Sequence, residues 1–244
     1  MPHVGTYIPA NIKNKMTPEG LEINDTDWYL EELYDFLKEM DVSILIATHS
    51  RYVIDLNRDL KNQSLYPGED VTGLVPTTTF NKKPIYKPEF DLRAVDIVDR
   101  HQYWRPYHKK LSNEIKRLKE KFVVSVLWDA HSIRSEVPRF FEGQLPDFNF
   151  GTNSGDTETL GLSQKLVAKV ESNGKYSAVE NGRFKGGYIT RNYGDPTNGI
   201  HSVQLELSQK TYMKEHSPFV YEETLTTDIK TLLKELILTT LTMR

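Results

Sequence analysis

Two polar residues, Asp129 and His131, stand directly after an apolar, β-branched run at residues 122–127. A run of that length and composition predicts a strand buried in a sheet. Polar side chains at the end of a buried strand need partners, and the carboxyl ends of strands in open α/β sheets are where ligands bind. We therefore interpret His131 as a residue of a functional site, with Asp129 close enough to orient its ring. The alternative is a hydrogen-bonded histidine in a strand-to-loop turn.

Three other places along the chain add side chains that bind metals or move protons. His3 lies in a Pro-His-Val-Gly segment that indicates a tight turn, Asp25 and Asp27 precede a helical pattern, and Glu206 lies in an alternating run typical of a buried strand. Two imidazoles and a carboxylate suit a catalytic zinc, which takes three protein ligands and keeps one position open. Glu206 would then act as the general base. The alternatives are a terminal histidine at His3 and helix capping by Asp25 and Asp27.

Arginine side chains recur near these positions. Arg51 and Arg58, with Asn57, lie in one dense polar segment, and Arg134 and Arg191 follow later in the chain. A guanidinium fork suits bidentate capture of a carboxylate and also stabilises a developing oxyanion. The alternative for the first segment is a surface ion-pair network. The chain has no His-Glu-x-x-His, no Gly-x-Ser-x-Gly and no phosphate-binding loop. The residues alone therefore indicate an α/β enzyme, a metallohydrolase of acidic substrates.

The elements expected to position these residues alternate between strands and helices, which predicts an α/β fold. Pro106 is expected to kink or split the longest helical pattern. A glycine-punctuated segment at residues 183–194 lacks the spacing of a dinucleotide-binding fingerprint. Expected strands are 42–48, 122–127, 176–180 and 200–207; expected helices are 28–40, 91–121, 160–172, 208–215 and 225–243; expected loops are 60–88 and 140–159.

Composition narrows the class of protein further. The 244 residues include 31 basic and 34 acidic side chains, a net charge of −3, which gives no electrostatic case for binding nucleic acid or an anionic membrane. The absence of cysteine excludes a disulfide framework and a cysteine nucleophile. No linker, signal peptide or apolar run of transmembrane length is visible. We expect one domain over residues 1–244, in a soluble protein of the cytoplasm without nucleic-acid or membrane partners.

Six segments spread over nearly the whole chain carry a resemblance to a known family. They lie at residues 2–5, 25–28, 50–58, 128–135, 181–191 and 203–207. In this order they closely resemble the N-formylglutamate amidohydrolase family, which is related to the zinc carboxypeptidases and aspartoacylases. The resemblance implies a three-layer α/β/α fold with a mixed central sheet, zinc-carboxypeptidase-like (phosphorylase/hydrolase-like). It also implies hydrolysis of a small acidic N-acyl amino acid, N-formyl-L-glutamate, to formate and L-glutamate in histidine degradation. Zinc or another divalent metal is the cofactor that it implies.

The same resemblance implies roles for individual residues. The order in the relatives is a first histidine, an Asn-Arg pair, a strand-end histidine and a glutamate. Here it corresponds to His3, Asn57 with Arg58, His131 and Glu206. The resemblance implies His3 and His131 as metal ligands; the carboxylate ligand must come from elsewhere in this sequence, and we expect Asp27, with Asp25 as the alternative. We expect Glu206 and Arg134 to be catalytic, and Arg51, Asn57, Arg58 and Arg191 to bind the substrate; of these, the resemblance itself implies Asn57, Arg58 and Glu206.

Three features depart from the family pattern. Thr6 stands where the relatives have a glutamate ligand three residues after the first histidine, and Asn192 stands where the family usually has a histidine. The family also typically has a strand before the Pro-His-x-Gly segment, and this sequence starts without it. Two other interpretations therefore stand beside the first. One is a deacylase of another N-acyl amino acid, and the other is a catalytically inactive binding protein on the same fold.

Overall fold

A mixed sheet forms the centre of the computed structural model, which describes residues 1–63, 65, 68–159 and 161–242. Within these residues the sheet has four strands: β1 (Ser125–Ile133), β2 (Phe148–Gly151), β3 (Ala178–Glu180) and β4 (Ile200–Ser208). Their order across the sheet is β1-β4-β2-β3. β4 is parallel to β1 and antiparallel to β2, and β2 is parallel to β3. A separate antiparallel pair is formed by β5 (Met213–Lys214) and β6 (Val220–Tyr221).

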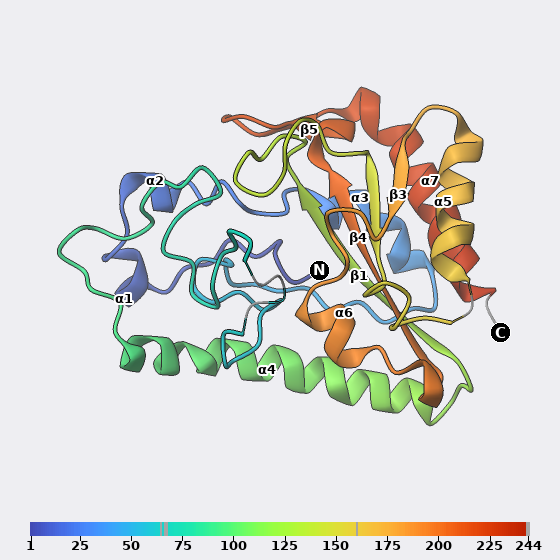
Figure 1. Ribbon diagram of the computed structural model, residues 1–244, viewed down its shortest axis with the longest axis horizontal. Helices are drawn as coiled ribbons and strands as arrows, with labels where there is room; N and C mark the ends of the chain where they lie inside the picture. Colours follow the sequence, from blue (N-terminus) through green and yellow to red (C-terminus); the bar gives the residue numbers. More distant parts are fainter. Residues whose placement is uncertain (64, 66–67, 160, 243–244) are drawn as a thin grey trace.

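Helices flank the sheet on both sides. Figure 1 shows α5 (Leu162–Asn173) and α7 (Glu223–Leu241) on one side, with α6 (Tyr188–Tyr193) on the other and α4 (Ala94–Lys119) along the lower edge of the view. The predicted α/β fold with a mixed central sheet is therefore confirmed. The remaining helical elements are short: α1 (Ala10–Lys13), α2 (Pro18–Leu21), α3 (Leu30–Leu33), and the 3₁₀ turns η1 (Asp35–Glu39), η2 (Pro196–Asn198) and η3 (Gln209–Thr211).

Two large hydrophobic cores hold these elements together, beside a smaller cluster of Phe80, Ile133, Val137 and Leu145. The first lies between the sheet and α3, α5 and α7, and it includes Leu166, Leu205 and Leu233, all fully buried. The second lies in the N-terminal part of the chain, where few regular elements occur, and it includes Val53 and Ile85, also fully buried. Burial of apolar side chains is the dominant stabilising contribution in folding. The irregular part of the chain is therefore a packed structure that can hold side chains in fixed positions.

The predicted boundaries of β1 are wrong in a way that matters for the site. The strand begins at Ser125 and continues through Asp129 and His131, whereas the sequence predicted that it ends before them. Phe122 and Val123, predicted to be buried, are 55% and 88% exposed. Pairing with the whole length of β4 sets the true limits. Asp129 and His131 are consequently side chains of a strand and face the same side of the sheet.

Other predicted elements also differ from the structure. Residues 42–48 form no strand, and Ile44 and Ile46 are 40% and 38% exposed; their backbone pairs only irregularly with the first residues of the chain, through bonds such as Ala47 N–H to Met1 O. The predicted helix at 208–215 is η3 followed by β5, the predicted loop at 140–159 contains β2, and the predicted helix at 28–40 is divided into α3 and η1.

The remaining elements agree with the periodicity of the sequence. α5, β3, β4 and α7 lie close to their predicted ranges, and the described residues of 60–88 form a loop. Pro106 does not split α4, which runs as one helix of 26 residues. Neighbouring aromatic residues of α4, among them Tyr103, Trp104 and Tyr107, pack against the second core. This packing offsets the hydrogen bond that the proline cannot donate.

Candidate metal centre

Four polar side chains lie together on one face of β1 and β4. In the parallel register Asp129 is opposite Gln204, and His131 is opposite Glu206. Residues two apart on a strand point to the same face, so the four side chains form a square. All four are buried, with between 2% and 8% of their surface exposed. Buried polar groups need hydrogen bonds or a bound ion, so this square indicates a functional site.

Two further polar residues reach the square from the N-terminal segment. His3, Asp27 and His131 are the one group in the described residues whose ligand atoms converge as a metal site requires. His131 Nδ1 lies 3.2 Å from Asp27 Oδ2 and 3.2 Å from His3 Nδ1, and His3 Nδ1 lies 3.8 Å from Asp27 Oδ2. A backbone hydrogen bond from Asp27 N–H to His3 O, 3.1 Å, joins the two N-terminal residues to each other.

The outer nitrogens of both imidazoles contact carboxylates. His3 Nε2 lies 2.7 Å from Asp55 Oδ1, and His131 Nε2 lies 3.1 Å from Asp129 Oδ1. A carboxylate accepts hydrogen bonds, so Nε2 of each ring carries a proton and Nδ1 presents a lone pair to the centre. Ligand atoms around a tetrahedral zinc lie roughly 3.3 Å apart at bond lengths of about 2.0–2.1 Å. The spacing and chemistry of the three converging atoms therefore fit zinc.

The carboxylates around His131 favour a positive charge on its imidazole ring. Burial lowers the pKa of His131, but Asp129, Asp27 and Glu206 outweigh it and raise the pKa to about 10. Burial also disfavours the charged form of Asp55, yet His3 and Arg51 hold the pKa of that carboxyl well below its usual range. The lowered pKa values of Asp55 and Asp129 thus keep these two carboxylates ionised beside the histidines. A site of this charge attracts either a proton or a metal ion.

Glu206 differs from these carboxylates because its own charge is poorly compensated. Burial is the main cause that raises its pKa to about 8; Asp27 and Asp129 add to the increase, while His131 and Arg51 oppose it. A carboxylate with a raised pKa accepts a proton readily near neutral pH. Its position beside His131 in the register of the sheet makes Glu206 a candidate general base.

The structure separates the two candidate carboxylates of the N-terminal segment. Asp25 Oδ2 accepts hydrogen bonds from the Tyr52 hydroxyl, 2.6 Å, and from Phe80 N–H, 2.8 Å. Asp25 therefore anchors the loop that contains Phe80, while Asp27 belongs to the converging group. Thr6, at the position of the glutamate ligand in the relatives of the family, is exposed.

Arg51 and Asn57 lie within the hydrogen-bond network of the centre. Arg51 is 8% exposed and donates to Asp55 Oδ2, 2.9 Å, and its Nη1 lies 3.8 Å from Asp27 Oδ1. Asn57 donates its backbone N–H to Asp55 Oδ1, 2.8 Å, and its side-chain Nδ2 lies 3.1 Å from His131 Nε2. Both residues thus hold Asp55, the carboxylate partner of His3, in place, and Asn57 also packs against the His131 ring.

The other three candidate arginines, Arg58, Arg134 and Arg191, are partly exposed. Arg58 donates to Thr72 O, 3.0 Å, and lines a cavity of about 200 Å³. Arg134 donates to Asn81 Oδ1, 2.9 Å, and Arg191 donates to Gly186 O, 2.8 Å. These guanidinium groups are held by loop atoms.

Sequence reasoning missed residues that support the ligands without joining them. Gln204 donates to Glu206 Oε2, 3.3 Å, and Thr190 donates to Asp129 Oδ2, 3.0 Å. Asp55 is one of several charged residues in the polar segment that contains Arg51 and Arg58, so the sequence alone did not indicate its role. Alternation along β4 could have identified Gln204, because it stands two residues before Glu206 on the same face.

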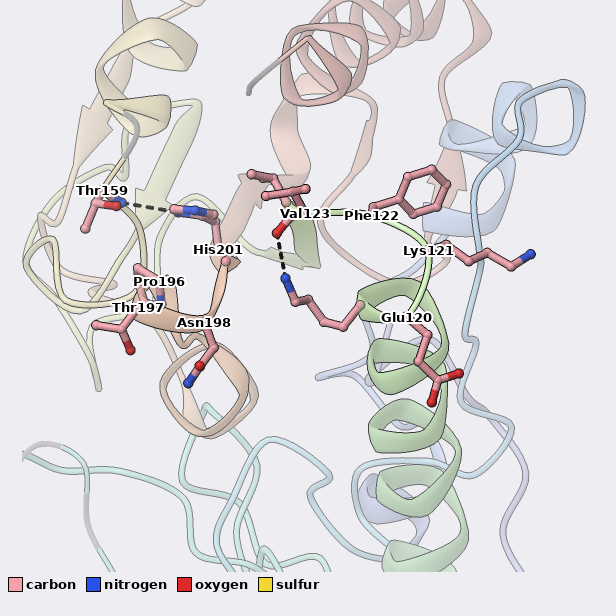
Figure 2. Close-up of a pocket in the computed structure, with 12 residues that line it drawn as sticks. Glu120, Lys121, Phe122, Val123, Thr159, Pro196, Thr197, Asn198 and His201 are labelled. Carbon is pink, nitrogen blue, oxygen red and sulfur yellow. Dashed lines mark hydrogen bonds between the residues drawn. The ribbon is translucent and has the colours of Figure 1, made fainter.

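A separate hollow of about 670 Å³ lies at the opposite end of the sheet, where β1 and β4 begin. Figure 2 shows His201 turned toward Thr159, whose N–H donates to His201 Nδ1, 3.3 Å. Val123, Pro196 and Asn198 also line it. These side chains do not form a converging set of metal ligands, so the candidate chemistry belongs to the other half of the sheet.

Fold and site together define an α/β protein with a buried His/Asp/His candidate metal centre and an adjacent glutamate. Residues 1–213 match the family model for N-formylglutamate amidohydrolase. The chain is 44% identical over 241 residues to the N-formylglutamate deformylases of Pseudomonas putida and Pseudomonas aeruginosa, covering 97% of this chain and 89% of each relative. It also resembles a crystal structure of N-formylglutamate amidohydrolase from Ralstonia eutropha JMP134, with a TM-score of 0.81 and 24% identity, covering 98% of this chain and 92% of that one.

This chain therefore belongs to the N-formylglutamate amidohydrolase family. The predicted family, and with it the predicted class of amide hydrolase, is confirmed. In the part of the chain that the structure describes, no helix is both long enough and apolar enough to cross a membrane.

Proposed function

We propose that this protein hydrolyses the amide bond of N-formyl-L-glutamate to give formate and L-glutamate, and that it does so in histidine degradation. The observation that supports the proposal most directly is the convergence of His3, Asp27 and His131, with Glu206 in register beside His131. We further propose that residues 1–244 form one domain, because the site combines residues as far apart in the chain as His3 and Glu206. The expected cytoplasmic location, and the expected lack of nucleic-acid and membrane partners, stay predictions.

His3, Asp27 and His131 would hold a zinc or another divalent ion. When bound, such an ion supplies Lewis-acid polarisation of a carbonyl and lowers the pKa of water. Asp55 and Asp129 accept hydrogen bonds from Nε2 of the two histidines, so that both Nδ1 atoms would be available as ligands. Arg51 keeps Asp55 ionised and in place.

Glu206 takes a proton from the attacking water and passes it to the leaving amine nitrogen. The water oxygen forms a bond to the formyl carbon, the carbon–nitrogen bond breaks, and formate and the amine of glutamate leave. Arg134 is assigned to the developing oxyanion. Asn57 and Arg58 are assigned to one substrate carboxylate, and Arg51 or Arg191 to the second, because guanidinium groups bind carboxylates in a bidentate manner.

The test is release of glutamate from N-formyl-L-glutamate by protein that has been stripped with a chelator and then given zinc. Activity that disappears and then returns would support both the substrate and the metal. Activity that survives removal of the metal would contradict the proposed metal dependence. Faster turnover of another member of a panel of N-acyl amino acids would favour the alternative deacylase, and bound metal with no turnover on the whole panel would favour the inactive binding protein.

A first variant tests the base directly. Glu206→Gln keeps the size of the side chain but removes the basic oxygen, so turnover should fall by about 10²-fold or more, the scale of a general acid–base group. Metal content and melting temperature should stay at wild-type values. Near-normal turnover in this variant would remove Glu206 from the mechanism.

A further inference from the structure

The beginning of α6 contacts three side chains of the site within four residues. Gly187 N–H donates to Gln204 Oε1, 2.7 Å, and Ile189 N–H donates to Asn57 Oδ1, 2.8 Å. The Thr190 hydroxyl donates to Asp129 Oδ2, 3.0 Å. Asn57 and Asp129 both contact His131, so two of these contacts lead to a candidate metal ligand. The third leads through Gln204 to Glu206.

The orientation of the Gln204 amide follows from its partners. A backbone N–H can only donate, so the oxygen of the amide must face Gly187. The nitrogen therefore faces Glu206 and donates to Oε2 at 3.3 Å. Gln204 is only 3% exposed, so it has little access to water as an alternative partner. Both ends of this side chain are thus committed, one to the main chain and one to the candidate base.

The backbone at Gly187 runs so close to Asn57 that only glycine fits this position. A Cβ at this position would lie 2.2 Å from Asn57 Nδ2, which no real contact allows. Gly186 has a φ of +105°, a conformation that L side chains rarely adopt. The two glycines thus let the chain pass close to Asn57 and place the Gly187 N–H against Gln204.

We propose that Gln204 is a positioning residue for hydrolysis. Its amide group holds Oε2 of Glu206, which leaves Oε1 of that carboxylate to take the proton of the attacking water. Because Gln204 is fixed by Gly187, the orientation of Glu206 depends on the same segment that holds Asn57 and Asp129 against His131. This proposal rests on the role of Glu206 as base in the proposed function.

The first experiment replaces Gln204 by methionine, which has a similar volume and no donor. The kcat of Gln204→Met on N-formyl-L-glutamate should fall by about 10- to 100-fold, the rate equivalent of one hydrogen bond to a charged group. KM should change less than twofold, and metal content should stay at the wild-type value, because no ligand is touched. A wild-type kcat would overturn the proposal. So would a parallel loss of metal, because Gln204 would then act through the ligands.

A second variant separates the two hydrogen bonds of Gln204. Gln204→Glu keeps an oxygen for Gly187 N–H but offers a second carboxyl to Glu206 in place of the amide donor. If donation to Glu206 is the function of Gln204, this variant should lose at least as much kcat as Gln204→Met. A kcat within threefold of wild type would show that only the link to Gly187 matters, which would overturn the proposal.

A double variant tests whether Gln204 acts through Glu206. In the Glu206→Gln background, the further change Gln204→Met should lower the residual kcat by less than twofold, because the carboxylate that it positions is gone. Equal losses in both backgrounds would overturn the proposal. The single variant Glu206→Gln distinguishes the two levels of failure. Normal turnover there would contradict the proposed base itself, whereas loss there with normal turnover in Gln204→Met would contradict only the positioning role.

Discussion

The two histidines of the candidate centre come from different regions of the molecule and carry matching carboxylates. His3 lies in the irregular N-terminal segment and contacts Asp55 at 2.7 Å. His131 lies on β1 of the sheet and contacts Asp129 at 3.1 Å. In both pairs Nε2 faces the carboxylate and Nδ1 faces the other ligands. A packed loop region and a sheet thus arrive at the same local arrangement, and each of them has its own hydrophobic core behind it.

The two pairs differ in the charge that surrounds the carboxylate. Asp55 accepts a hydrogen bond from the Arg51 guanidinium, whereas Asp129 accepts one from the neutral Thr190 hydroxyl. Burial and then Arg51 lower the pKa of His3. Burial also lowers the pKa of His131, but the surrounding carboxylates outweigh it and raise that pKa to about 10. Without a metal, the extra proton therefore resides on the histidine of the sheet.

The largest effect is expected from Asp27→Ala, because Asp27 is the carboxylate that both histidines approach. Metal affinity should fall by well over the roughly 100-fold that loss of an outer partner causes, and activity should fall with it. Titration with zinc against a competing chelator measures this. The matched control is Asp25→Asn, two residues away, which should keep metal affinity because Asp25 bonds to Tyr52 and Phe80 instead. Equal metal loss in both variants would contradict the assignment of the ligand.

The next largest effects should distinguish the two outer carboxylates. Asp55→Asn and Asp129→Asn should each lower metal affinity by about 10- to 100-fold, since both fix a ligand histidine. Asp55→Asn should also lower the free energy of unfolding of the metal-free protein by about 3 kcal/mol, because it leaves the buried Arg51 without its nearest carboxylate. Asp129→Asn leaves His131 without its nearest carboxylate, but a histidine can release its proton whereas an arginine stays charged, so this variant should destabilise less. Chemical denaturation of both variants measures the difference, and equal destabilisation would remove the distinction between the two pairs.

The pH dependence of metal binding should report the proton on His131. Metal binding displaces that proton, so affinity should rise about tenfold per pH unit at pH values below the pKa of about 10. Zinc affinity measured at pH 6, 7 and 8 tests this. Asp129→Asn should make the dependence shallower, because Asp129 is the strongest of the contributions that raise this pKa. An affinity that does not change over this range would place the proton elsewhere.

The sequence predicted the sheet and its helices better than the irregular N-terminal segment that contains His3 and Asp55. Alternation along β4 and the 3.6-residue period of α5 and α7 reflect burial against neighbours, so local pattern was enough to locate these elements. The chain around His3 and Asp55 has no such period, and its hydrogen bond joins residues 52 apart in sequence. The structure brings together His3, Asp27 and His131, the three residues predicted to hold the metal. Gln204 and Asp55 stayed unassigned, because residue type alone does not show which polar group supports another.

The smallest effect is expected where α4 contacts the backbone around Asn57, in the irregular N-terminal part of the chain. Trp104 Nε1 donates to Arg58 O, 3.0 Å. The ring of His108 stacks on Trp104, and its Nε2 lies 2.8 Å from Leu56 O. The helix therefore fixes the backbone on both sides of Asn57. Trp104→Phe removes one neutral hydrogen bond, worth about 1 kcal/mol, or roughly fivefold in an equilibrium constant. If Arg58 binds a substrate carboxylate, KM should rise by about that factor, while kcat and metal content stay unchanged. A fall in kcat with constant KM would instead show that α4 acts on the centre through Asn57, and would move Arg58 from substrate binding to support of the ligands.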